Sequence, residues 1–91
     1  MTESRTYRIV GRVQGVGFRW FTCERARREG LVGEVWNQPD GCVEAVAEGE
    51  LLALDRFEVA IRRGPAGARV ETVARDIGPA SGRFADFSIK G

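Results

Sequence analysis

The chain has 91 residues, of which 43% are hydrophobic and 30% charged, a composition typical of one globular domain rather than two. Its 14 lysines and arginines against 13 acidic residues leave a net charge of +1, which does not favour general binding to nucleic acid or to anionic membranes. No apolar stretch is long enough to cross a bilayer, and no apolar segment typical of a secretory signal follows Met1. Histidine, the commonest general base and metal ligand, is absent.

The two cysteines are too few for a disulfide framework. We expect free thiols in a cytoplasmic protein, with Cys23 packed in the interior and Cys42, which follows a turn, at the surface. Residues 1–91 are expected to form a single domain with a flexible tail at about residues 1–5. We also expect a monomer, with no metal, no cofactor and no membrane or nucleic-acid partner.

The first predicted strand covers Thr6 to Val13, where Tyr7 and Ile9 alternate with charged residues in the period-2 pattern of a half-buried strand. Two glycines then interrupt the pattern within Gln14-Gly15-Val16-Gly17. A helix is predicted from Phe18 to about Glu29, and Gly30 stands where a helix commonly ends on glycine.

The rest of the chain predicts a hairpin, a second helix and two further strands. In the penultimate strand we expect a bulge, because its inward positions Val70 and Val73 are three residues apart. The predicted elements are strand Leu31–Asn37, a turn at 38–41, strand Cys42–Glu48, helix Glu50–Arg63, strand Ala68–Ile77 and a fifth strand Arg83–Lys90. This β-α-β-β-α-β order with a short added strand predicts a ferredoxin-like α+β sandwich, a mostly antiparallel sheet with both helices on one face.

The junction between the first strand and the first helix has the features of an anion site. The first turn of a helix has N–H groups without partners and a partial positive charge, and Gly15 and Gly17 allow the backbone to approach a ligand closely. Arg19 lies in that turn, where a cation is unfavourable unless an anion binds beside it. A tight turn beside a solvated surface arginine would also explain these residues. Neither a Walker loop nor a dinucleotide fingerprint fits the spacing.

This stretch resembles the signature of the acylphosphatase family, Gly-x-Val-Gln-Gly-Val-x-Phe-Arg, from Gly11 to Arg19. A second family block, Gly-x-Val-x-Asn-x-x-Asp-Gly-x-Val-Glu, is matched from Gly33 to Glu44, and the stretches Ala47–Gly49 and Arg62–Val70 are also similar to the family. The resemblance therefore covers nearly the whole chain, in register with the predicted elements. The chain departs from the family at Glu34, where an aromatic residue is common, and at Trp36, where a basic or small polar residue is common.

The resemblance implies an enzyme that hydrolyses acyl phosphates to a carboxylate and inorganic phosphate without a metal. Arg19 resembles the arginine that binds the phosphate, and Asn37 the asparagine that orients the attacking water. The phosphate cradle corresponds to Gln14, Gly15, Val16, Gly17, Phe18 and Arg19. If the strand Thr6 to Val13, before the loop, and the strand Leu31–Asn37, before the turn, are neighbours in the sheet, Asn37 comes within reach of this cradle. A residue that simply favours the following turn would also explain Asn37.

Two other functions are compatible with this fold class. A non-catalytic regulatory module would bind phosphate or another small anion through Arg19 without hydrolysing an acyl phosphate. An RNA-binding domain is less well supported, because the aromatic RNP1 pattern on a central strand is missing.

Overall fold

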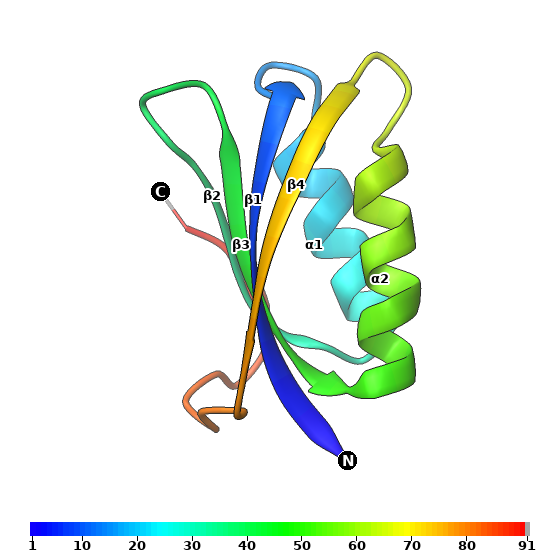
Figure 1. Cartoon of the computed structure of the whole chain (residues 1–91), viewed down its shortest axis with the longest axis vertical. Helices are drawn as coiled ribbons and strands as arrows, with labels where there is room; N and C mark the ends of the chain where they lie inside the picture. The colour runs from blue at the N-terminus through cyan, green and yellow to red at the C-terminus, as the bar shows by residue number, and fades with distance from the viewer. Residues whose placement is uncertain (91) are drawn as a thin grey trace.

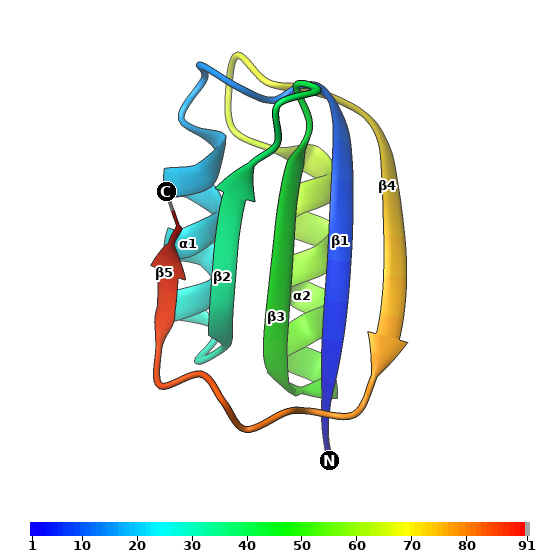
Figure 2. The same cartoon turned by 90° about the vertical axis from the view of Figure 1, so that its left-hand side faces the viewer.

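The structure, a computed structural model, describes residues 1–90. The elements follow in the order β1 (Thr2–Arg12), α1 (Phe18–Arg28), β2 (Val32–Asn37), β3 (Val43–Glu50), α2 (Leu51–Arg63), β4 (Arg69–Gly78) and β5 (Phe87–Ile89). The strands form one sheet in the order β4-β1-β3-β2-β5, and both helices lie against the same face of it (Figure 1; Figure 2). All neighbouring pairs are antiparallel except β2 and β5. The predicted ferredoxin-like α+β fold is therefore confirmed.

Two features of the predicted strands are wrong. The tail expected at residues 1–5 belongs largely to β1, which begins at Thr2 and pairs there with Glu50 of β3. The fifth strand, predicted over Arg83–Lys90, is shorter, because β5 covers only Phe87–Ile89. The preceding connection crosses one end of the sheet, where Ser81 donates hydrogen bonds from its amide and its hydroxyl to the buried carboxylate of Glu48, at 2.9 and 2.8 Å (Figure 2).

The helices bury the faces that their sequence spacing predicts. Phe18, Thr22 and Ala26 of α1 are buried at i, i+4 and i+8, and α2 buries Leu54, Phe57 and Ile61. Helix α1 ends at Arg28 and is followed, after the C-cap Glu29, by Gly30 at φ 73°, whose amide donates to Arg27 O at 3.1 Å. The amide of Leu31 donates to Ala26 O at 2.9 Å, which completes a Schellman motif.

The bulge predicted in β4 is confirmed. Val10 of β1 pairs with Thr72 and the next residue, Gly11, pairs with Val70, so Glu71 is the extra residue of β4. Val70 and Val73 consequently both pack against the core, although they are three residues apart.

Both cysteines are free thiols, as expected, and Cys23 is buried. The surface position expected for Cys42 is wrong, because its side chain is buried where β3 begins. Burial raises the pKa of the Cys42 thiol to about 11, with a further contribution from a hydrogen bond to Asp40, so this thiol is protonated near neutral pH. Within residues 1–90, neither helix is long and apolar enough to cross a lipid bilayer.

Candidate active site

The loop between β1 and α1 has two glycines in the left-handed region. Gly15 and Gly17 both have φ of 76°, and a Cβ at either position would meet no atom within 4 Å. The glycines are therefore required by backbone conformation rather than by crowding. Gly17 is the N-cap of α1, and no side chain forms a hydrogen bond that caps this end of the helix.

The start of α1 consequently presents free amides. Phe21 is the first residue of the helix with an intrahelical partner, its amide donating to Gly17 O at 3.0 Å. The hydrogen bonds recorded within residues 1–90 leave the amides of Phe18, Arg19 and Trp20 without an acceptor. An anion in front of this turn would supply the acceptors and would be stabilised by the helix dipole.

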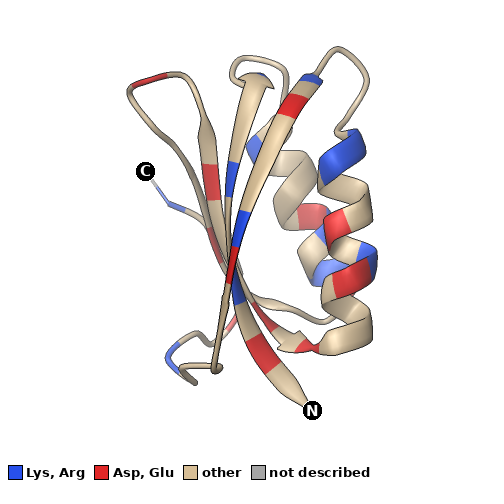
Figure 3. Ribbon diagram, in the orientation of Figure 1, with Lys and Arg blue, Asp and Glu red and all other residues tan. Residues whose placement is uncertain are grey.

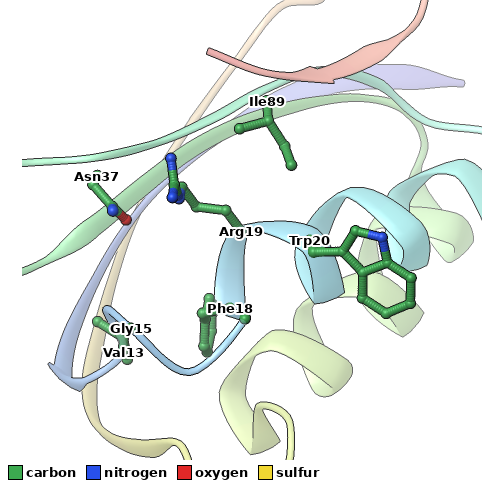
Figure 4. A pocket seen from close by; sticks show the side chains of 8 residues that line it. Val13, Gly15, Phe18, Arg19, Trp20, Asn37 and Ile89 are labelled. Carbon is green, nitrogen blue, oxygen red and sulfur yellow. The ribbon is translucent and has the colours of Figure 1, made fainter. Parts of the chain in front are cut away.

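Arg19 lies in the same turn, and its side chain extends from α1 toward the strands, on the side where Asn37 lies (Figure 4). It forms no ion pair with any acidic residue among the 90 that the structure describes. A guanidinium without a carboxylate partner can donate two parallel hydrogen bonds to the same anion that the free helix amides bind.

Arg19 and the loop glycines share a cavity with Asn37. The cavity has a volume of about 210 Å³ and is lined by Val13, Gly15, Gly17, Phe18, Arg19, Trp20, Asn37 and Ile89 (Figure 4). The structure thus brings together four of the six predicted cradle residues and the predicted asparagine. Arg19 is the one ionisable side chain in this lining.

Asn37 reaches the cavity although its strand, β2, is not a neighbour of β1 in the sheet. Strand β3 lies between β1 and β2, and its residue Val43 pairs with Ile9 on one side and with Asn37 on the other. Because β1 and β2 both run antiparallel to β3, they are parallel to each other and end at the same edge of the sheet. The loop after β1 and the last residue of β2 therefore meet at this edge.

The side-chain oxygen of Asn37 is the unusual polar atom of the cavity. Oδ1 is buried and has no hydrogen-bond partner among the described residues. Leaving a buried acceptor unpaired costs about 1–3 kcal/mol, so such an atom in a cavity is typical of a group that binds water or a ligand.

Gln14 and Val16, the other two predicted cradle residues, do not line the cavity. Val16 packs against the core. The Gln14 side chain donates hydrogen bonds from Nε2 to Gln38 O at 2.8 Å and to Cys42 O at 3.0 Å. Gln14 thus ties the loop after β1 to the turn that follows Asn37. The sequence contains no signal for this contact, because both acceptors are main-chain carbonyls.

An ion pair holds the turn beside Asn37. Asp40 accepts hydrogen bonds from the Arg8 guanidinium and, at 3.1 Å, from the amide of Cys42. Arg8 foremost, together with Cys42, lowers the pKa of Asp40 far below its usual value, so the carboxylate is ionised at neutral pH. This anchor limits the movement of the turn and therefore of Asn37.

Comparison with known proteins gives the same family over nearly the whole chain. The sequence model described as Acylphosphatase matches residues 5–89. An acylphosphatase of Salinibacter ruber is 49% identical over 90 residues, which cover 98% of this chain and 95% of that protein. The chain belongs to the acylphosphatase family.

Other acylphosphatases support the assignment in sequence and in structure. The enzyme of Rubrobacter xylanophilus is 50% identical over 82 residues, covering 90% of this chain and 74% of that protein. The crystal structure of the acylphosphatase from Bacillus subtilis superposes with a TM-score of 0.93 at 36% identity, with both chains covered completely. The protein is therefore an enzyme of this family, and its fold is the family's fold.

The two positions at which the chain departs from the acylphosphatase pattern lie outside the cavity lining. Glu34 and Trp36 are both partly buried residues of β2. The Lys90 ammonium lies over the Trp36 ring at 5.8 Å from its centroid. Such a cation–π contact contributes roughly 0.5–1 kcal/mol at an exposed site, so Trp36 has a structural partner at the edge formed by β2 and β5.

Proposed function

We propose that the chain hydrolyses small-molecule acyl phosphates by direct in-line attack of water on phosphorus. In this mechanism Arg19 and main-chain amides of residues 14–19 bind the phosphate, and Asn37 orients the water. The products are a carboxylate and inorganic phosphate. The proposal rests on one observation above all: the buried Oδ1 of Asn37 and the guanidinium of Arg19 line one cavity, and within residues 1–90 the first has no hydrogen-bond partner and the second no ion pair.

The phosphate is bound by complementary groups on two sides. The free amides at the start of α1 donate to its oxygens, and the fork of Arg19 donates two further hydrogen bonds. Phosphoryl transfer passes through a loose transition state whose charge lies on the equatorial oxygens. Fixed amides and a guanidinium stabilise this charge without reorganising at the moment of reaction.

Asn37 supplies the position of the nucleophile. Its Oδ1 accepts a hydrogen bond from a water molecule, which satisfies the buried acceptor and directs a lone pair of the water at phosphorus. Positioning of this kind is typically worth about 10²-fold or more in rate. An amide is sufficient for the task because the water needs orientation rather than a strong base when the leaving group is good.

The leaving group needs no general acid. The conjugate acid of a carboxylate has a pKa of about 4, so the acyl group departs as the anion when the P–O bond breaks and takes the bonding electron pair. The water oxygen forms the new bond to phosphorus, and the proton that it loses passes to a phosphate oxygen. A cavity whose one ionisable side chain is an arginine is compatible with this chemistry.

The decisive experiment compares wild type with Asn37→Ala in the hydrolysis of benzoyl phosphate in excess EDTA. The wild type is expected to turn over under these conditions. Asn37→Ala should lower kcat by about 10²-fold and leave the inhibition constant of inorganic phosphate nearly unchanged, because the phosphate contacts remain. Glu34→Gln, on the same strand but outside the cavity, is the matched control and should keep wild-type kinetics.

Two results would contradict the proposal. Near-full turnover by Asn37→Ala would remove the asparagine from the mechanism. Binding of inorganic phosphate by the wild type without hydrolysis of any acyl phosphate would favour a non-catalytic anion-binding module instead.

A further inference from the structure

In-line displacement fixes where the acyl part of the substrate must lie. The attacking water and the departing oxygen occupy opposite sides of phosphorus. If Asn37 holds the water, the acyl group extends away from Asn37. It then passes the Arg19 guanidinium, which binds the phosphate. Figure 4 shows which side chain lies there: Asn37 and Trp20 are on opposite sides of Arg19.

Trp20 is a large apolar side chain that the fold does not bury. It follows Arg19 in the first turn of α1, lines the cavity and is 65% exposed, whereas Phe18, one residue before Arg19, is almost completely buried. Packing within the chain therefore does not explain an indole at this position. Exposed aromatic surface beside a polar cavity is typical of a binding subsite.

A second exposed apolar side chain lines the same cavity from the sheet. Ile89 of β5 is 42% exposed, and its position is fixed because it pairs with Val35 of β2, two residues before Asn37. The amide of Lys90 donates to Val35 O at 2.9 Å, and Arg27 of α1 donates from Nε to Phe87 O at 3.0 Å. These contacts hold β5 against β2 and against α1, the helix that carries Trp20.

We propose that Trp20 and Ile89 bind the acyl group of the substrate and select apolar, preferably aromatic, acyl phosphates over small ones such as acetyl phosphate. The inference rests on the proposed function, because Arg19 must seat the phosphate before the acyl group can reach Trp20. The indole offers its face to a planar acyl group, and Ile89 covers that group from the sheet side. An acetyl group is too small to use either surface fully.

The kinetic test uses benzoyl phosphate and acetyl phosphate on the same variants. Trp20→Ala should raise KM for benzoyl phosphate about 10-fold, while KM for acetyl phosphate and the inhibition constant of inorganic phosphate change less than about twofold. Trp20→Phe, which keeps an aromatic face, should restore most of the preference. Leu52→Ala removes a side chain that is 71% exposed on α2, outside the cavity lining, and is the matched control. A Trp20→Ala variant that changes KM equally for both substrates, or for neither, overturns the inference.

A second measurement detects the contact between Trp20 and the acyl group in the absence of turnover. In a Trp36→Phe variant, Trp20 is the one remaining tryptophan of the sequence. Benzoylphosphonate, a non-hydrolysable analogue, should change its fluorescence with saturation, whereas acetylphosphonate should bind without a comparable change. An equal response to both analogues, or none to either, contradicts the subsite. Loss of hydrolysis in Asn37→Ala is unaffected by these results, so a failure of the subsite can be distinguished from a failure of the proposed mechanism.

Discussion

Two charged regions of the molecule differ in how their polar groups are paired. Around Glu58 of α2, every group has a partner: the carboxylate, only 13% exposed, accepts hydrogen bonds from Arg5, Tyr7, Arg62 and Arg75. Acidic and basic residues are interleaved along α2 and β4 in this region (Figure 3). Around the cavity, Arg19 has no ion pair within residues 1–90 and the buried Oδ1 of Asn37 has no partner.

The difference indicates which groups stabilise the fold and which are kept for a ligand. A buried polar group without a partner lowers stability, and a cation in the first turn of a helix is unfavourable by about 0.3–1 kcal/mol. Both unfavourable features, an unpartnered buried oxygen and a cation in the first turn of a helix, occur at the cavity. Neither occurs in the Glu58 network. We therefore expect substitutions in the two regions to change different quantities, activity in one and stability in the other.

The largest expected effect is that of Arg19→Ala. Removing the guanidinium should lower kcat/KM for benzoyl phosphate by about 10³-fold, the scale of losing a preorganised charge on the transferred phosphoryl group. The melting temperature should stay the same or rise slightly, because an unfavourable cation leaves the helix N-terminus. Arg19→Lys keeps the charge without the fork and should recover only part of the loss. A variant that loses activity because it melts well below wild type would place Arg19 among the structural residues.

Glu58→Gln should give the opposite pattern. The neutral amide leaves the Arg5 guanidinium, whose side chain is 7% exposed, with a weaker set of partners. Since Glu3 and Asp55 still pair with Arg5, we expect a loss of about 2 kcal/mol in the free energy of unfolding, measured by urea denaturation. Both kcat and KM should match wild type. A change in activity at unchanged stability would contradict the separation of the two regions.

The smallest expected effect is on how the free energy of unfolding depends on pH under acidic conditions. Burial alone would raise the pKa of Glu58, but the hydrogen bonds from Arg75, Arg62 and Tyr7 together lower it below its ordinary value of 4.5. Because the folded pKa is lower than the unfolded one, the stabilisation is complete above about pH 4.5 and is lost as the pH falls through the folded pKa. Glu58→Gln should therefore flatten the pH dependence of the unfolding free energy below that pH. An unchanged slope would show that other carboxyl groups determine it.

Much of the fold follows from local sequence patterns. The spacing of Leu54, Phe57 and Ile61 predicts the buried face of α2, and the interval between Val70 and Val73 predicts the bulge of β4. The start of β1 is not predicted, because Thr2 to Arg5 lack alternating apolar residues. Arg5 is buried there through ion pairs with Glu3, Asp55 and Glu58, which come mostly from distant parts of the sequence.

The site, like the fold, is predictable where it depends on local sequence and not where it depends on long-range contacts. Two left-handed glycines followed by an arginine in the first turn of a helix indicate an anion site locally, and the structure has this geometry. The order of strands in the sheet is a long-range property, so the sequence does not show that β3 separates Asn37 from β1. The contacts of Gln14 across 24 and 28 residues and the burial of Cys42 depend on that same arrangement.

The most direct test of phosphate binding at this site follows the amides of residues 14–20 by NMR while inorganic phosphate is added. We expect saturable shifts of the amides of Phe18, Arg19 and Trp20, retained in Asn37→Ala and lost in Arg19→Ala. Phosphate that binds with equal affinity to the Arg19→Ala variant, or that shifts amides elsewhere and leaves these unchanged, would contradict this expectation.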